Sequence, residues 1–269
     1  MKIMIVYNIF TGHMSFGIGR KLKKLKSKCL LLYKFIFPEN LYIFILYILC
    51  RNKFKSKINS LKDKTPWSEN LDEINKFEYK ITSQNNEDGI IDYLVNNISN
   101  PDNTFCEIGI DFYEFNSLNL IKNNWKGLLI ENDELKCDKL KACLKKFYNK
   151  SEVIIKNSYI SYDNLNNIIS ENINKKDFDI LSIDIDGMEY WVLECLEVNP
   201  KIICVEFNPW MGKNDVITVP KFINFTYRWD YYYGASILAF TKLLKKKNYK
   251  LVAIDSTGTN AFFIIQKYS

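Results

Sequence analysis

Histidine is almost missing from this chain, which has one, His13, among 269 residues. A Ser-His-Asp triad and a histidine-rich zinc site both need a histidine inside the site, and His13 lies far upstream of the acidic stretches described below. Proton transfer would therefore depend on Asp, Glu, Tyr, Lys or Cys. None of the seven cysteines forms a Cys-x-x-Cys pair. Their odd number and apolar neighbours predict free thiols in a reducing, cytoplasmic compartment.

A long uninterrupted apolar run is also missing. Residues 29–50 are the most apolar part, but polar residues and a proline interrupt them, and the continuous piece 41–50 is too short to span a bilayer. Basic clusters flank this part within residues 20–57. Two alternatives follow. Residues 20–57 contact an anionic membrane surface, peripheral to the inner membrane, or they form a helical hairpin packed on the main domain with its lysines in solvent.

A net positive charge is confined to this N-terminal quarter. Residues 1–64 hold 14 Lys/Arg and two acids, a charge of +12, so that −6 is left for residues 65–269 out of the total of +6. A globally basic nucleic-acid-binding protein is therefore disfavoured, and no nucleic-acid partner is expected. We predict a basic, apolar, helical extension with a linker over residues 1–77 and one α/β domain over residues 78–269.

Apolar strands alternate with helices through the second part. The expected strands are 104–110, 127–130, 152–155, 178–185, 201–206, 251–254 and 261–265, and the expected helices are 90–98, 116–123, 134–148, 165–171, 188–198 and 234–247. This alternation predicts a Rossmann-like, doubly wound, mostly parallel seven-stranded sheet.

Asp184 and Asp186 stand at the end of the isoleucine-rich strand 178–185, and Gly187 and a helix follow. Two positions apart, their side chains would share one face of the strand, and ligands of open α/β sheets bind outside the carboxyl ends of the strands. Two acids there predict a cation, a hydroxyl proton or ribose hydroxyls as partner. Glu131 and Glu206 also end strands, so we expect one acidic site. The alternative is that one Asp caps the following helix and the other is solvated.

An ordered set of short motifs resembles a known family. The set is Ser83-Gln84-x-x-Glu87-Asp88, Glu107-x-Gly109, Asn116-Ser117, Trp125-x-Gly127, Ser182-Ile183-Asp184-Ile185-Asp186-Gly187-x-x-Tyr190-Trp191, Glu206-x-Asn208, Thr218-Val219-Pro220, Tyr233-Gly234-Ala235-Ser236 and Gly258-x-Asn260-Ala261-Phe262-Phe263. Residues 79–267 thereby resemble a branch of the class I S-adenosylmethionine (SAM)-dependent methyltransferases related to the FkbM group, which often accompany bacterial surface-polysaccharide genes.

The resemblance implies SAM as the cofactor and assigns residues to it. Glu107 and Gly109 would line the methionine part, and Asp111 and Asn116 would also contact the cofactor. Glu131 would hold the ribose hydroxyls, which matches the place where such folds bind them.

The resemblance also implies an acceptor side. Asp184 and Asp186 would face the methyl group and the acceptor, a hydroxyl of a sugar or polysaccharide precursor, and Glu206 with Asn208 would complete that side. Asp186 is the candidate base, oriented by Asp184. Asp184, Asp186 and Glu206 could instead share a Mg²⁺ ion, because hard cations prefer carboxylate oxygens.

The chain departs from the family at residues 109–116, which lack the usual glycine-rich loop. Glycine lets backbone approach a ligand closely, whereas Phe112 and Tyr113 are expected to crowd that approach or to stack on the ligand.

Two other functions are compatible with the sequence. Asp184-x-Asp186 also matches the metal-binding motif of nucleotide-sugar glycosyltransferases, which follows a hydrophobic run in the same way. Alternatively, the missing glycines and the basic, apolar extension fit a degenerate, non-catalytic Rossmann scaffold at a membrane surface.

Overall fold

The computed structural model describes most of the α/β part and a few residues of the extension. The described residues are 74–112, 114–148, 151–173, 177–222, 225–227 and 231–268, with 28, 38, 41, 42 and 44–48 before them. Where the extension is described, Leu41, Tyr42 and residues 44–48 are helical. The other predictions for residues 1–73 lie outside the described residues. No helix within the described ranges is long and apolar enough to cross a bilayer.

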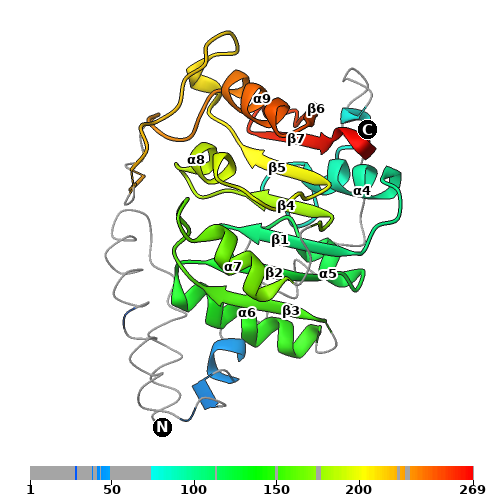
Figure 1. Cartoon of the computed structure of the whole chain (residues 1–269). Helices are drawn as coiled ribbons and strands as arrows, with labels where there is room; N and C mark the ends of the chain where they lie inside the picture. The colour runs from blue at the N-terminus through cyan, green and yellow to red at the C-terminus, as the bar shows by residue number, and fades with distance from the viewer. Residues whose placement is uncertain are drawn as a thin grey trace, which may run out of the picture.

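Seven strands form one sheet, in the order β3-β2-β1-β4-β5-β7-β6. In Figure 1 the sheet runs from β3 near the bottom to β6 near the top. The strands are β1 (Thr104–Ile108), β2 (Lys126–Glu131), β3 (Val153–Asn157), β4 (Ile180–Ile183), β5 (Ile202–Glu206), β6 (Tyr249–Ile254) and β7 (Asn260–Ile265). Every predicted strand is found, and the predicted seven-stranded Rossmann-like fold is confirmed.

The prediction of a mostly parallel sheet is wrong, because the sheet is mixed. β1 to β5 pair in parallel, whereas β7 runs antiparallel to both β5 and β6. Only residues 255–259 join β6 to β7, and a parallel crossover needs a dozen residues or more. The short link forces a hairpin, and β6 carries a bulge between Leu251 and Ala253.

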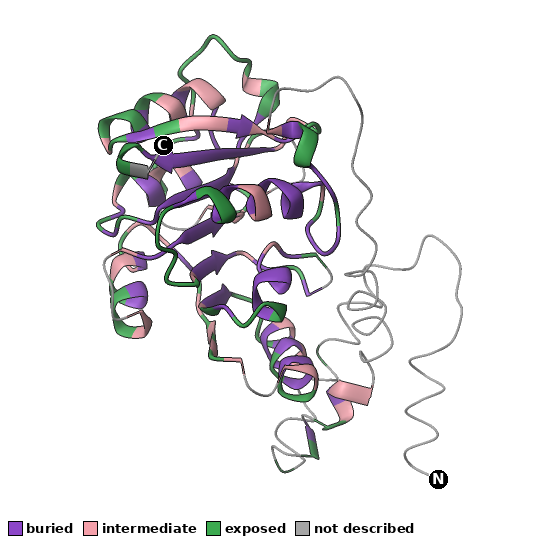
Figure 2. Ribbon diagram, turned by 90° about the vertical axis from the view of Figure 1, so that its right-hand side faces the viewer, coloured by how far each residue is buried: buried purple, intermediate pink, exposed green. Residues whose placement is uncertain are grey.

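Helices cover both faces of the sheet. They are α4 (Glu87–Asn97), α5 (Leu118–Lys122), α6 (Glu134–Phe147), α7 (Leu165–Asn172), α8 (Glu189–Glu194) and α9 (Ile237–Lys246). Side chains of α7, α8 and α9 share one apolar cluster with the sheet, and those of α4, α5 and α6 share the other. Figure 2 shows the buried residues concentrated in the strands and on the inner sides of the helices. Strands enclosed on both faces explain the continuous apolar runs of the sequence.

The extension packs on α6 through one side of its helix. Tyr42 and Leu46 are 1% and 0% exposed, and the rings of Tyr47 and Phe147 lie 6.1 Å apart, centroid to centroid. This helix therefore contacts the α/β part, while the two alternatives for residues 20–57 stay predictions. The division into residues 1–77 and 78–269 stays a prediction.

Candidate functional site

A cavity of about 670 Å³ opens at the carboxyl ends of the parallel strands. Apart from Asn208, all the residues that the sequence assigned to the site line it, namely Glu107, Gly109, Asp111, Asn116, Glu131, Asp184, Asp186 and Glu206. They come from four neighbouring strands and the loops that follow them, and Asn260 adds a fifth strand, β7. The structure thus brings the predicted residues together, while their roles stay predictions.

Asp184 and Asp186 face this cavity because a third carboxylate, that of Glu189, accepts the hydrogen bonds of the backbone amides in the turn after β4. Glu189, fully buried, accepts hydrogen bonds from the amides of Ile185 (3.0 Å) and Gly187 (2.9 Å). No side chain caps α8 at its N-cap residue, Met188. The expectation that one of the two aspartates caps this helix is therefore wrong. Asp186 has φ of 55°, a left-handed conformation that Asp adopts more readily than most residues.

Asp184 and Glu206 follow each other across β4 and β5 at the edge of the sheet. One carboxylate oxygen of Asp184 lies within 4.8 Å of one of Glu206. Burial raises the pKa of both, and the charges of neighbouring carboxylates raise the pKa of both further. Glu206 Oε2 is buried and has no hydrogen-bond partner among the described residues. The pair is therefore ready to hold a proton or to meet a ligand.

The opposite end of the same strands shows how this chain neutralises a structural acid. Asp179, at the start of β4, is fully buried, and the Nζ of the buried Lys201 lies 2.8 Å from its carboxylate. The Asp184–Glu206 pair has no such lysine or arginine among the ion pairs of the described part of the chain. This pair is thus left for something other than a salt bridge.

Glu131 ends β2 and is oriented by backbone on both sides. Its carboxylate accepts hydrogen bonds from the amides of Ile110 (2.9 Å) and Asp133 (2.8 Å), and the Nζ of Lys136 lies 3.9 Å away. Lys136 also pairs with Asp111 at 3.7 Å. A carboxylate offers about four lone-pair positions, so Glu131 keeps acceptor capacity toward the cavity.

Glu107, at the end of β1, is 4% exposed and holds the loop that follows it. Its two oxygens accept from the amides of Asn116 (2.7 Å) and Ser117 (2.8 Å), and the Ser117 hydroxyl donates to it as well. Burial raises the pKa of Glu107, and these donors act in the opposite direction. The Asn116 side chain donates to Ser182 Oγ at 3.0 Å. The main effect of Glu107 on a bound ligand is therefore indirect, because it positions the loop that lines the cavity.

Gly109 is required by the protein itself. Its φ is +80°, and a Cβ there would lie 1.5 Å from the carbonyl oxygen of Asp184. The expectation that Phe112 crowds the ligand or stacks on it is wrong, because Phe112 is 3% exposed and belongs to the apolar cluster under α4, α5 and α6. Tyr113 lies outside the described residues. The backbone of Gly109, Ile110 and Asp111 can therefore line the cavity without a glycine-rich sequence.

The sequence analysis did not predict a further wall of the cavity, which contains the carboxylate of Glu87 and the amides of Gln84 and Asn260. Glu87 is 1% exposed, accepts from the amide of Asn85 (2.7 Å) and from Asn260 Nδ2 (2.5 Å), and burial raises its pKa to about 7. Asn260 pairs with Glu206 across β5 and β7, so this wall continues the acidic edge. Glu87 and Asn260 belong to quoted motifs, but no local pattern assigned them a role.

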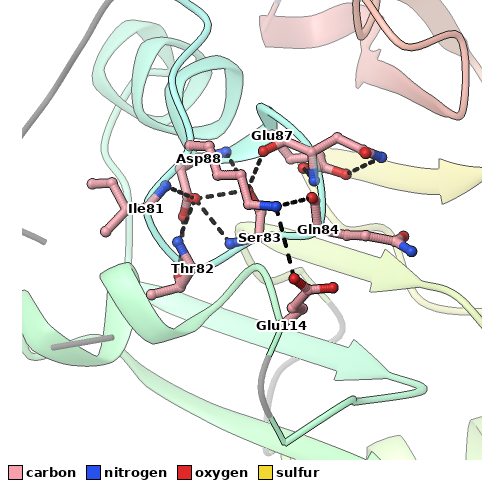
Figure 3. Close-up of polar contacts among 9 residues, drawn as sticks. Ile81, Thr82, Ser83, Gln84, Glu87, Asp88 and Glu114 are labelled. Atoms are coloured by element: carbon pink, nitrogen blue, oxygen red, sulfur yellow. Dashed lines mark hydrogen bonds and ion pairs between the residues drawn. The ribbon is translucent and has the colours of Figure 1, made fainter. Parts of the chain in front are cut away.

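Asp88 holds the segment that presents this wall, as Figure 3 shows. Its carboxylate accepts from the amides of Ile81 (2.7 Å), Thr82 (2.8 Å) and Ser83 (2.9 Å) and from the Ser83 hydroxyl (2.6 Å). With the Thr82 hydroxyl (3.2 Å), five donors on one buried carboxylate fix residues 81–83, and Gln84 and Glu87 follow directly.

Asn208 does not line the cavity. It is fully buried, donates to the carbonyls of Tyr231 (2.8 Å) and Tyr233 (2.9 Å), and accepts from the amide of Trp210 (3.0 Å). Its side chain therefore ties the loop after β5 to the segment before α9.

Asp184, Asp186 and Glu206 also meet the geometric condition for a metal site. One carboxylate oxygen of each lies within 4.8 Å of those of the other two. Three oxygen donors suit a hard cation such as Mg²⁺, but exposed acids also gather without one.

Comparisons with known proteins give fold-level similarity only. No known protein family matches the chain, and no curated protein matches it significantly. Among solved structures, the magnesium protoporphyrin IX methyltransferase of Synechocystis PCC 6803 with bound SAM is 9% identical, with a TM-score of 0.45 over 85% of this chain and 97% of that chain.

Two further structures are similar to the same degree. The N-terminal domain of EvdMO1 with bound S-adenosylhomocysteine (SAH) is 8% identical, with a TM-score of 0.44 over 80% of this chain and 94% of that chain. The METTL16 methyltransferase domain is 11% identical, with a TM-score of 0.45 over 67% of both chains. These likenesses are too weak to transfer a ligand or a reaction to this chain, and the FkbM group is not named among them.

Proposed function

We propose that the protein is a SAM-dependent methyltransferase that acts on a hydroxyl of a sugar or polysaccharide precursor. The observation that carries the proposal is the cavity that runs along β2, β1, β4, β5 and β7, with Glu131 at one end and Asn260 at the other. Four steps between neighbouring strands amount to about 19 Å. This length suits an extended cofactor and an acceptor side by side.

The half of the cavity over β2 and β1 fits the cofactor. Glu131 is held by two backbone amides and keeps lone pairs for the two hydroxyls of a ribose. Glu107 holds the loop from Gly109 to Ser117, so that loop backbone, together with the Asn116 side chain, would contact the rest of the cofactor.

The charge of the wall supports a cationic ligand. Eight carboxylates line the cavity, and Lys136 is the single Lys or Arg among the described residues that line it. When bound, SAM would supply an activated methyl group on a positively charged sulfonium, and it also carries an ammonium group. A nucleotide sugar carries a diphosphate, which this wall would repel unless a metal ion intervened. The wall therefore favours the methyltransferase over the glycosyltransferase alternative.

The Asp184–Glu206 pair suits the role of general base better than the predicted Asp186 oriented by Asp184. Because both pKa values are raised, the two carboxyl groups would share one proton, and the ionised member would bind a further proton more strongly than an ordinary carboxylate does. It would take the proton of the acceptor hydroxyl while the wall holds that hydroxyl in line with the methyl group. Asp186, the most exposed of the three, would contact the acceptor at the mouth of the cavity.

A Mg²⁺ ion on Asp184, Asp186 and Glu206 is the alternative way to neutralise the same three carboxylates. The proton-sharing proposal expects methyl transfer to continue in the presence of a chelator. Loss of methyl transfer in EDTA and its recovery with Mg²⁺ would show that a metal ion, and not a shared proton, neutralises these carboxylates.

Calorimetry with SAH tests the cofactor half. We expect the full chain to bind SAH and Glu131→Ala to bind it at least about tenfold more weakly, because a hydrogen-bonded carboxylate is worth about 1.5–3 kcal/mol. Glu152→Ala is the matched control, since Glu152 is exposed and pairs only with Lys126 at the amino end of β2. We expect its affinity to equal that of the unaltered chain.

Two outcomes would contradict the proposal. No measurable affinity at millimolar SAM or SAH would favour the non-catalytic scaffold. Equal losses of affinity in both variants would show that Glu131 does not contact the cofactor. Incorporation of labelled methyl groups into a panel of neutral, amino and acidic sugars then tests the acceptor, and the acidic wall predicts that acidic sugars are the poorest.

A further inference from the structure

The described helix of the extension has a buried side and an exposed side. Tyr42 and Leu46, four positions apart, are 1% and 0% exposed, whereas Leu41 and Phe44 are 43% and 55% exposed. Residues four apart lie on the same side of a helix. The buried side faces α6 and leaves the side with Leu41 and Phe44 toward solvent.

Contacts on the buried side fix which residues point outward. The Tyr42 ring lies against α6, where burial and the neighbouring Asp138 raise the pKa of its hydroxyl. The rings of Tyr47 and Phe147 meet near the other end of α6. In Figure 1 this helix is the blue segment below α6. Because two points are anchored, Leu41 and Phe44 cannot turn inward without breaking the packing.

Positive charge surrounds the exposed apolar side chains in the sequence. Residues 20–57 contain eleven Lys/Arg and one acid, and 18 of the 22 residues between 29 and 50 are apolar or aromatic. α6 adds three exposed lysines, Lys141, Lys145 and Lys146. The rest of the chain, residues 65–269, is negative, so this charge is local.

We propose that Leu41 and Phe44 insert into the surface of an anionic lipid bilayer, to which the net positive charge of residues 20–57 attracts the chain. Aliphatic and aromatic side chains gain from an apolar phase, and cations near an anionic membrane each add to the attraction. A second copy of the chain would bring the same positive charge to the same contact and would be repelled. The proposal is independent of methyl transfer.

Flotation with lipid vesicles tests the proposal on the full chain. We expect binding to vesicles of phosphatidylcholine with phosphatidylglycerol, weaker binding to phosphatidylcholine alone, and loss of binding at high salt. The double variant Leu41→Ser/Phe44→Ser should bind the anionic vesicles at least about tenfold more weakly, which corresponds to about 1.4 kcal/mol.

The matched control is Val216→Ser/Phe222→Ser, which removes two side chains that are 51% and 53% exposed on another part of the surface. We expect the control to bind like the unaltered chain. Absence of binding at low salt, equal binding to both vesicle types, or equal losses in the two variants would overturn the proposal. So would a dimer in light scattering without lipid that Leu41→Ser/Phe44→Ser converts to a monomer, because a second copy would then cover this side.

Discussion

At the scale of single residues, the loop after β1 depends on one close approach of backbone to backbone. Gly109 stands where β1 ends and passes the carbonyl of Asp184 with no room for a side chain. Its left-handed φ and this contact are separate reasons for glycine, and each destabilises a substitution on its own.

We expect Gly109→Ala to lower the free energy of unfolding by about 3 kcal/mol, from the left-handed backbone and the clash together. Gly258→Ala separates the two effects, because Gly258 has φ of +72° and no neighbouring atom lies within 4 Å of the place that a Cβ would take. Its expected loss is about 1 kcal/mol. Urea denaturation measures both, and equal losses would show that the backbone near Asp184 gives way to a methyl group at little cost.

The Asp184–Glu206 pair makes stability depend on pH. The folded chain keeps a proton that the unfolded chain releases above about pH 4, because the folded pKa values are raised. The pair therefore lowers the free energy of unfolding as pH rises from about 4 through the raised pKa values.

We expect Glu206→Gln to be about 1 kcal/mol more stable than the unaltered chain at pH 8 and to differ little at pH 4, while losing methyl transfer. Urea denaturation across this pH range is the measurement. Glu87 and Glu189 also have raised pKa values. The free energy of unfolding of the variant should therefore still fall as pH rises, but less steeply. A variant that is less stable at pH 8 would show that the two carboxylates do not repel each other.

At the scale of elements, α4 and the segment before it form one wall of the cavity. Asp88 ties residues 81–83 to the first turn of α4, and Glu87 and Gln84 reach the cavity as a result. The geometry of this wall depends on one buried carboxylate.

We expect Asp88→Ala to lower the free energy of unfolding by about 3 kcal/mol, because several amides lose a charged acceptor at once. Ser83→Ala removes only the hydroxyl contacts and should cost about 1 kcal/mol. Hydrogen exchange at Ile81, Thr82 and Ser83 should become faster in Asp88→Ala. Unchanged exchange there would show that other contacts hold the segment.

The sequence predicts where the strands and helices lie well, and how they order and pack in space less well. Apolar runs such as Ile180–Ile183 locate the strands, and acids at their ends locate the site, because both signals are local. The short link 255–259 sets β7 antiparallel to β6, whereas the pairing of β7 with β5 depends on how strands order in space, which the alternation of elements does not report. Phe112 and Glu87 were misjudged for the same reason, since burial in a distant cluster and pairing with Asn260 are decided by tertiary packing.

At the scale of the whole molecule, the basic extension packs on α6, the helix next to the edge strand β3. Leu46 is fully buried on the side of the helix that also holds Tyr42, and Leu41, on the exposed side, is 43% exposed. The same helix thus contains a packing residue and a surface residue of one chemical type.

We expect Leu46→Ala to lower the free energy of unfolding by about 2–4 kcal/mol, because it leaves a cavity against α6, and Leu41→Ala to change it by less than about 1 kcal/mol. Limited proteolysis should cut the extension of Leu46→Ala faster. Similar stability of the two variants would mean that the extension and the α/β part unfold independently.

The bulge between Leu251 and Ala253 has a consequence for handling the protein at high concentration. β6 lies at one end of the sheet, and an open end of a sheet is a template on which other chains can add strands and aggregate. The bulge interrupts the regular spacing of donors and acceptors along β6, and the Asn75 side chain occupies the carbonyl of Ile254. This edge is therefore a poor seed for fibrils.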